Sequence, residues 1–386
     1  MSHTIAIVGA GPAGLSTAHF LAKAGIPHTL IDRAVFPRDK ICGESYDGKV
    51  YHTLRRIDPG LPGRMQEEGV LRPGRQYQLL VEGTPPLPVV FSEEATPRLQ
   101  GRRRAFDYFL LDELLQKGYT TWMPGTQVEK YREKPGGWEL NVKNGQTIPA
   151  AAVVFAAGSK APNPFFPNAA KNTEELLFYR MHVHSESAES AEDWIEFHLQ
   201  HQPVPTCLAL CPLGDGTYNA EVGLRRQDYR RIGRSLPSYL REVLSRRLSS
   251  VTYEGHGAGT SMQLHRYSGP LSGARWLVAG SAAIQVNPIT GMGVGNAMRM
   301  GEIAAQLLIE QQAEGTSWSL EAYNTRVRQA LRQEIRFSRL VTWLQHRPRW
   351  LRPVMHSLSR TKRVRHWLQQ PDLVEQFTNP TFYQRR

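Results

Sequence analysis

Residues Thr4–Arg33 read TIAIVGAGPAGLSTAHFLAKAGIPHTLIDR, and this stretch decides the fold. A short apolar run leads into a glycine-rich turn, a helical pattern follows, and a second apolar run ends at Asp32. That order is typical of the βαβ unit that binds dinucleotides. The sequence therefore predicts an α/β fold that opens with a Rossmann-like domain.

The three glycines of this turn, Gly9, Gly11 and Gly14, have GxGxxG spacing. Gly9 allows the tight turn, Gly11 leaves room for a pyrophosphate, and Gly14 lets helix and strand pack closely. Backbone N–H groups at the start of the helix then face the anion. Asp32 lies 18 residues after Gly14, where its carboxylate can accept hydrogen bonds from ribose hydroxyls, with Arg33 beside it. We expect these five residues to hold the nucleotide half of a cofactor.

Composition indicates an ordinary globular protein. The 386 residues are 40% hydrophobic, show no repeat or low-complexity tract, and leave room for two intertwined domains. No apolar run approaches the roughly 18 residues of a membrane span, and no signal peptide pattern opens the chain, so we expect a cytoplasmic protein. Three cysteines predict no disulfide framework. The 13 histidines lack the cysteine or acid spacing of a metal site, and none is predicted.

The net charge of +12 is concentrated near the C-terminus. Residues 336–371 carry nine Lys or Arg and no Asp or Glu, together with Trp343, Trp350 and Trp367. Basic helices with tryptophan on the apolar side suit an anionic membrane surface. The alternative is a solvated basic face whose tryptophans pack on the main domain. No recognition motif accompanies the charge, so no nucleic-acid partner is expected.

The middle of the chain alternates between helical and strand patterns. Residues 103–117 have helical spacing of their apolar positions. The run GWELNVKNGQTIPAAAVVFAAG at 137–158 reads as a β-hairpin with an Asn144-Gly145 turn, followed by a buried strand that ends at Gly158. Both segments extend the nucleotide fold.

A separate antiparallel sheet is predicted from the β-rich and alternating runs within residues 178–225. This sheet is the natural place for a substrate. After Trp276 the chain returns to a buried strand, and a second glycine loop begins at Gly280. Part of the nucleotide fold is therefore supplied late in the chain, after the second sheet.

Several motifs together resemble the FAD-dependent oxidoreductases of the para-hydroxybenzoate hydroxylase fold (GR2 type). They are the N-terminal GxGxxG with Asp32, the strand ending VVFAAG, and GSAAIQVNPITGMGVGNAMRMGEIAA. Within that fold the chain is most similar to the geranylgeranyl reductase family. RDKICGES at Arg38–Ser45 is similar to the family's CGG or CGE motif, and RRAFD to its RxxFD helix start. CLALCPLGDGTYNAEVG at Cys207–Gly223 lies where the family has YxWxFP followed by VG.

The resemblance implies that one FAD molecule spans both glycine loops, with its ADP half on the first and its flavin half beside the second. The family's second loop begins Gly-Asp, whereas this chain has Gly280-Ser281, so we expect weaker or altered cofactor retention. The further cofactor residues that the resemblance implies are Arg103, Gly158, Gly280, Ser281, Pro288, Gly291 and Gly293.

Three regions follow from the patterns and the resemblance together. They are a discontinuous FAD-binding domain (1–75, 101–175 and 270–330), a β-sheet substrate domain (76–100 and 176–269) and a basic helical C-terminal region (331–386).

The family's Tyr, Trp and Phe of YxWxFP correspond here to Cys207, Ala209 and Cys211. Alternate residues of a strand face one side, so all three changes shrink side chains on one surface. The resemblance thus implies a wider pocket, open to a bulkier polyene, polyketide or aromatic substrate. The alternative is that other aromatics, such as Tyr179, Trp194 or Tyr218, refill the space.

Cys42 matches the cysteine of the family motif, in a loop that the resemblance places against the flavin. Its thiol could donate a proton after hydride transfer, or merely fill an apolar gap. Glu44 is an alternative acid, and Lys40 is a candidate for stabilising reduced flavin. These three residues are the catalytic candidates.

The expected function is FAD-dependent reduction of a double bond in a hydrophobic substrate. No second GxGxxG exists, so NAD(P)H or another reductant would bind transiently as electron donor. A flavin monooxygenase that hydroxylates or epoxidises its substrate is the principal alternative, and a non-catalytic flavin-fold binding protein is the second. The sequence leaves the substrate and the oligomeric state open.

Overall fold

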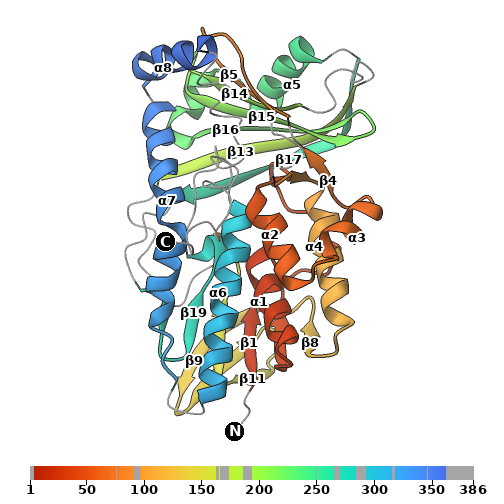
Figure 1. The fold of residues 1–386 in the computed structure, drawn as a ribbon, viewed down its shortest axis with the longest axis vertical. Helices are drawn as coiled ribbons and strands as arrows, with labels where there is room; N and C mark the ends of the chain where they lie inside the picture. Colours follow the sequence, from red (N-terminus) through yellow and green to blue (C-terminus); the bar gives the residue numbers. More distant parts are fainter. Residues whose placement is uncertain are drawn as a thin grey trace.

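The computed structural model describes residues 4–74, 76–90, 96–161, 165, 174–185, 194–248, 250–264, 270–283, 293–314, 318–345 and 347–361. In Figure 1 a nucleotide-binding unit occupies the lower part of the molecule, and a large antiparallel sheet lies across its top. Of the two helices that follow the nucleotide unit in sequence, the first runs upward along one side and the second lies at the level of that sheet.

The nucleotide unit is built on a six-stranded sheet with the order β18-β19-β12-β1-β2-β8. All neighbours are parallel except β18 and β19. The central strands β1, β2 and β12 are buried at every position, as expected for a parallel sheet covered on both faces. The strands are β1 (Ile5–Val8), β2 (His28–Ile31), β8 (Thr120–Met123), β12 (Ala152–Phe155), β18 (Ser272–Gly273) and β19 (Trp276–Val278).

Helices cover one face of this sheet, and a small antiparallel sheet covers the other. The helix after the first glycine loop approaches the late helix so closely that a Cβ on Gly301 would lie 2.2 Å from the Ala13 carbonyl oxygen. The small sheet contains the predicted hairpin, which is confirmed, with its turn at Gly145. The elements are α1 (Pro12–Lys23), α2 (Gly48–Ile57), α3 (Leu61–Glu67), α4 (Arg103–Leu115) and α6 (Gly293–Glu314), and β9 (Val128–Lys134), β10 (Gly137–Val142) and β11 (Thr147–Ala150).

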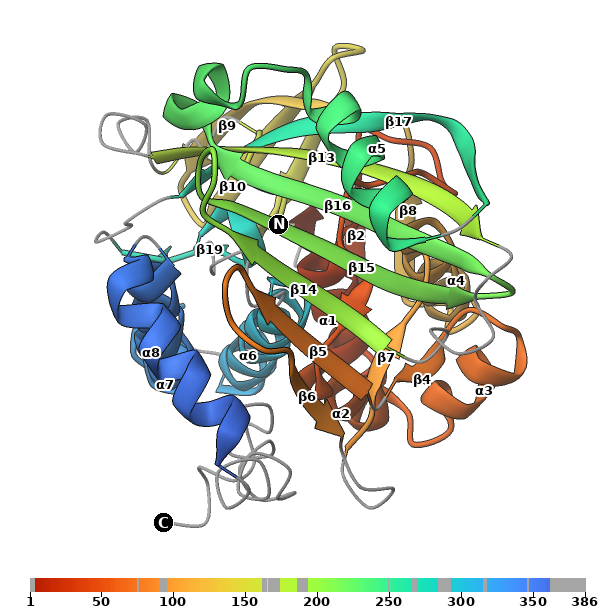
Figure 2. The ribbon, with the colours of Figure 1, turned by 90° about the horizontal axis from the view of Figure 1, so that it is seen from above.

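The second large element is a seven-stranded sheet with the order β17-β13-β16-β15-β14-β5-β6. Every pair is antiparallel except β14 and β5. Its outer face packs against α5 (Leu236–Arg247), which crosses above the strands in Figure 2. Its inner face is directed toward the nucleotide unit. The strands are β5 (Gln76–Val81), β6 (Leu87–Val90), β13 (Glu174–Ser185), β14 (Trp194–Gln200), β15 (Thr206–Gly214), β16 (Thr217–Arg225) and β17 (Val251–Leu264).

Two of the domain boundaries predicted from the sequence do not coincide with the ends of structural units. Of the predicted stretch 76–100, only β5 and β6 join the large sheet, since β7 (Arg98–Gln100) pairs with β3 (Ser45–Tyr46) and β4 (Arg72–Gly74). The boundary predicted at 330 falls inside one continuous helix. The remaining elements are the 3-10 helices η3 (Arg226–Ile232) and η4 (Gly280–Ala282), and the helices α7 (Ala322–Gln345) and α8 (Pro348–Arg360).

None of the helices in the described part of the chain is long and apolar enough to cross a membrane.

Candidate active site

The first glycine loop has the geometry of a pyrophosphate cradle. Gly9 has φ +107, and a Cβ there would lie 2.4 Å from the Ala156 carbonyl oxygen. A Cβ on Gly14 would lie 1.8 Å from the Gly9 carbonyl oxygen. At Gly11, by contrast, a Cβ would meet only the Arg38 Nη2 atom, at 3.8 Å. The loop is therefore tight where the fold needs it and open at Gly11, where the phosphates of a dinucleotide would approach.

Asp32 ends β2 and fixes the loop. Its Oδ2 atom accepts a hydrogen bond from the Ala10 N–H at 2.7 Å, and its Oδ1 atom accepts one from the Ala34 N–H at 2.8 Å. A carboxylate oxygen has a second lone pair, so both atoms can still accept from ribose hydroxyls. Arg33 beside it is exposed.

The second glycine loop begins against the first. Gly280 has φ +67, and a Cβ there would lie 3.0 Å from that of Ala13 in α1. Gly158 follows β12 and has φ +81. A Cβ added to Gly158 would lie 3.9 Å from the Oγ atom of Ser281. The structure thus brings Gly158, Gly280 and Ser281 next to the first loop. Gly293 begins α6, and the predicted cofactor residues Pro288 and Gly291 lie outside the described residues.

Three cations lie near one another, and one of them, Arg38, is beside Gly11 of the first loop. Buried Asp107 binds the Arg103 guanidinium through two hydrogen bonds of 2.9 and 2.7 Å, and it pairs with Arg38 at 3.2 Å. Desolvation, together with the positive charges of Arg103 and Arg38, lowers the pKa of Lys40, although much of its side chain is exposed. This set of charges suits the phosphates of a dinucleotide and the negative charge of a reduced flavin. Sequence reasoning missed Arg38, which opens the RDKICGES motif.

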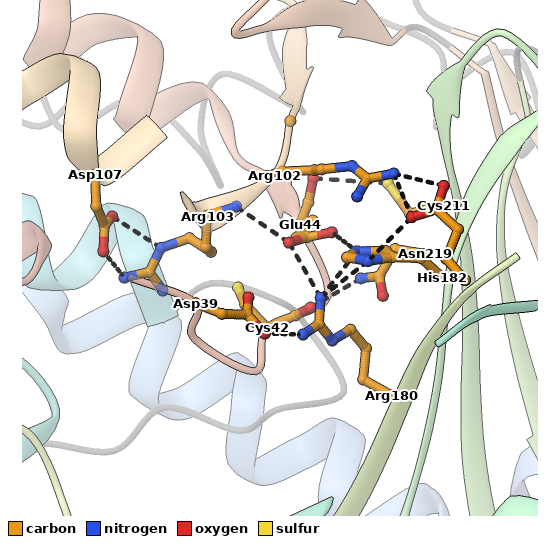
Figure 3. A network of polar contacts seen from close by, with 12 residues as sticks. Asp39, Cys42, Glu44, Arg102, Arg103, Asp107, Arg180, His182, Cys211 and Asn219 are labelled. Atoms are coloured by element: carbon orange, nitrogen blue, oxygen red, sulfur yellow. Dashed lines mark hydrogen bonds and ion pairs between the residues drawn. The ribbon is translucent and has the colours of Figure 1, made fainter. Parts of the chain in front are cut away.

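The loop that carries Cys42 and Glu44 is anchored to the sheet above it (Figure 3). Glu44 is fully buried, and its backbone has φ 57, which is uncommon for a residue with a side chain. Its Oε1 atom accepts from the Arg103 N–H at 3.1 Å, and its Oε2 atom accepts from His182 Nε2 at 2.7 Å. The Arg180 guanidinium lies 3.6 Å from Oε1. We call this set the Glu44 junction.

Further contacts hold the same loop from both ends. Arg180 pairs with Asp39 at 2.5 Å, and the Asn219 side chain donates to the Cys42 carbonyl oxygen at 2.8 Å. The Cys211 Sγ atom lies 3.7 Å from the Glu44 carbonyl oxygen. Residues from β13, β15 and β16 therefore fix the loop that would face the flavin.

Strand register explains why these side chains converge. In β13 and β16, Arg180 is paired with Glu221 and His182 with Asn219. In β15 and β16, Ala209 is opposite Glu221 and Cys211 opposite Asn219. Alternate residues of a strand point to one face, so all of them lie on the inner face. The signal in the sequence is the polar residue at every second position of FYRMHVH and TYNAEVG.

Two groups in this region have pKa values raised by burial. Burial raises the pKa of the Cys42 thiol, and the charges of Glu221 and Glu44 add to the effect while Arg103 opposes it. Burial also raises the pKa of Glu221 to about 7, with Arg180 opposing and Glu44 adding. Both are candidate proton donors. Sequence reasoning identified Cys42 but missed Glu221.

The three predicted pocket residues lie on the inner face but differ in exposure. Cys207 and Ala209 are partly exposed, whereas Cys211 is buried against Tyr77 and Ile195. Of the neighbouring aromatics, Phe197 is directly opposite Ala209.

The aromatics predicted as alternatives to refill the pocket point elsewhere. Tyr218 and Tyr179 pack in the core on the outer face. Trp194 alternates with the inner residues of β14 and so does not share their face. Ala209 therefore has apolar Phe197 on one side and Glu221 on the other, and it stays partly exposed between them.

The two glycine loops, Asp32 and the cations fit FAD, and the fold with these features defines an FAD-dependent oxidoreductase. Over residues 2–338 the sequence matches the family described as FAD binding domain, and the chain belongs to that family.

Comparisons with known proteins agree with this assignment. Menaquinone reductase of Mycolicibacterium smegmatis is 25% identical over 317 residues, which cover 79% of this chain and 76% of the relative. The crystal structure of a geranylgeranyl bacteriochlorophyll reductase-like protein from Thermoplasma acidophilum shares the fold, with a TM-score of 0.74, 15% identity and 98% coverage of both chains. A mutant of the halogenase PltM in complex with FAD also shares it, with a TM-score of 0.70, 16% identity and coverage of 85% of this chain and 74% of that one.

Proposed function

We propose that the protein uses reduced FAD to saturate a carbon–carbon double bond in a hydrophobic substrate. The observation that carries this proposal is the placement of the Cys42 loop beneath the inner face of the sheet, held there by the 2.8 Å hydrogen bond from Asn219. FAD, when bound and reduced, supplies a hydride, so the chain must supply a proton. NAD(P)H or another reductant would then restore the reduced cofactor.

The protonated thiol of Cys42 is the donor that this reaction needs. Because burial raises its pKa, the thiol keeps its proton at neutral pH until the substrate accepts it. The Arg103 charge favours the thiolate that remains. Glu221 can return a proton to it, since its own pKa lies near 7. The substrate gains one hydride and one proton, and the cofactor loses two electrons.

Glu44 is better suited to hold the loop than to donate a proton. Both of its carboxylate oxygens already accept hydrogen bonds, from Arg103 and His182, and Arg180 is close to one of them. We therefore assign the proton to Cys42 and the anchoring role to Glu44.

The apolar part of the inner face supports a hydrophobic substrate. Partly exposed Ala209, Cys207, Phe197 and Leu79 form a strip across β15, β14 and β5. The two reductases among the similar proteins have names that point to hydrophobic substrates.

Flavin-dependent monooxygenation is the second candidate. The small side chains of Cys207 and Ala209 leave room beside the inner face, and the halogenase shares the fold. In that reaction oxygen would be reduced at the cofactor, and one oxygen atom would enter the product.

An anaerobic reaction with reduced protein tests the proposal. The FAD-loaded protein is reduced with light, mixed with menaquinone or a geranylgeranyl lipid, and followed by flavin absorbance and product mass. We expect a product with two added hydrogens, and Cys42→Ala should slow the reaction by about 100-fold while FAD affinity stays unchanged. Ser245→Ala, at an exposed position of α5 on the outer face, is the control. Labelled oxygen in the product of an aerobic reaction would overturn the proposal in favour of the monooxygenase.

A further inference from the structure

We propose that the junction of α7 and α8 is a docking surface for an anionic lipid bilayer. The surface, which we call the tryptophan patch, consists of Trp343, Arg347, Arg349, Trp350 and Val354. Trp350 is 63% exposed, Trp343 44% and Val354 43%. No other tryptophan among the described residues is exposed to this degree.

The geometry of the patch keeps its aromatic rings outward. The rings of Trp343 and Trp350 lie 6.4 Å apart between centroids, and the Arg347 guanidinium lies 4.6 Å above the Trp343 ring. Tryptophan rings that carry an N–H and lie beside a cation are suited to the headgroup region of a bilayer, where apolar and polar surroundings meet. A tryptophan that served only the core would be covered instead.

Charge identifies the occupant as anionic. Arg347, Arg349 and Arg360 are exposed, and α8 contains no Asp or Glu. Arg352 has Glu82 at 4.0 Å, on the side of α8 toward the sheet strands. Basic side chains beside exposed apolar rings match a membrane with anionic headgroups, where attraction and shallow insertion act together.

The opposite side of α8 connects the patch to the substrate sheet. Leu351 and Met355 are buried in one cluster with Val81 and Leu199, and partly buried Cys207 of the inner face packs against it. Figure 1 shows α8 at the level of this sheet, and Figure 2 shows it beside the β5 and β6 edge. A bilayer on the tryptophan patch would thus lie one helix away from the apolar strip. The remainder of the basic segment, residues 362–371, lies outside the described part of the chain.

Vesicle co-sedimentation of the full-length protein tests the inference. Vesicles of phosphatidylcholine alone and of phosphatidylcholine with about 30% phosphatidylglycerol are compared at low and high salt. We expect binding to the anionic vesicles that weakens with salt. Trp343→Ala/Trp350→Ala and Arg347→Glu/Arg349→Glu should each weaken binding by about tenfold or more. The matched controls are Tyr108→Ala, an exposed aromatic of α4, and Lys130→Glu/Arg132→Glu on exposed β9.

Each other result would overturn the inference. Equal binding to neutral and anionic vesicles would show that charge does not direct binding. Absence of binding to both would show that the tryptophan patch is a solvated surface. Equal weakening by the control variants would show that the site is not at α7 and α8. Tighter binding to a duplex oligonucleotide than to anionic vesicles, at the same salt, would identify nucleic acid as the partner instead.

Discussion

The first glycine loop is built mainly from neighbours in the sequence, between β1 and α1, and Asp32 and Ala156 support it from the ends of the adjacent strands. The Glu44 junction draws on Glu44, Arg103, Arg180 and His182, which belong to both halves of the molecule. The loop depends on the absence of side-chain atoms, whereas the junction depends on pairing charges across an interface. The two should therefore respond differently to substitution.

The largest effect should follow from filling the loop at Gly14. A Cβ there would lie 1.8 Å from the Gly9 carbonyl oxygen and 3.3 Å from Ile7 Cγ2, so Gly14→Val must push α1 away from β1. We expect a loss of about 3 kcal/mol or more in the free energy of unfolding, measured by urea denaturation without FAD. A variant as stable as the wild type would contradict the close packing of α1 against the first glycine loop.

Gly11→Val should separate cofactor binding from folding. A Cβ at this position would meet only Arg38, so the protein without FAD should keep its stability within about 0.5 kcal/mol. The added side chain occupies the approach of the pyrophosphate, and FAD affinity should fall by about 100-fold or more. Flavin fluorescence quenching measures the affinity. Unchanged affinity would contradict the position of the cradle.

Glu44→Gln tests the charge pairing of the junction. The amide keeps the shape of the side chain but removes one of the carboxylates that pair with buried Arg180, and the loss of stability should be about 3 kcal/mol. Glu310→Gln is the control, since its pair with Arg326 is exposed and should contribute less than about 1 kcal/mol. Equal losses in urea denaturation for the two variants would refute the special importance of the buried junction.

Glu221→Gln should change the pH dependence of stability. The pKa of Glu221 is raised to about 7 from an ordinary 4.5, so the folded protein keeps this proton where the unfolded chain has lost it. The stabilising effect is full at low pH and declines as pH rises from about 4.5 to about 7. Relative to wild type, the variant should therefore gain about 1–3 kcal/mol between pH 4 and pH 8.

Glu196 on the outer face provides the comparison for that experiment, because its pKa is shifted in the opposite direction. Burial would raise its pKa, but hydrogen bonds from Arg247 and His198 outweigh burial and lower it to about 2. Its contribution to stability is present above pH 4.5 and is lost as pH falls toward 2. Relative to wild type, Glu196→Gln should thus lose stability between pH 4 and pH 8, by slightly less than about 1 kcal/mol, because most of the change falls below pH 4. The same direction of change in both variants would contradict this difference between the faces.

The parts of the molecule governed by local patterns could be predicted from the sequence. The βαβ unit, the hairpin at Gly145 and the helix that begins at Arg103 each depend on spacing within a few dozen residues. The family resemblance added Cys42 and Glu44, and the structure places both in the loop beneath the inner face.

The partners of that loop could not be predicted in the same way. His182 and Arg180 lie on an alternating strand, where the pattern shows that they share a face but not what the face meets. Their meeting with Glu44 depends on how the large sheet docks on the nucleotide unit, and the sequence contains no local signal for that. The raised pKa of Glu221 has the same origin, because the effect comes from desolvation in the assembled molecule.

The late return of the chain to the nucleotide unit also affects its synthesis. The Ser16 hydroxyl in α1 donates to the Met298 carbonyl oxygen in α6, a contact between residues 282 positions apart. At about 5–20 residues per second, a ribosome needs roughly 15 to 60 s to travel from one to the other. Throughout that interval the α6-binding side of α1 has no native cover. The nascent N-terminal domain is therefore a candidate client for a ribosome-associated chaperone, and its release should coincide with the emergence of α6.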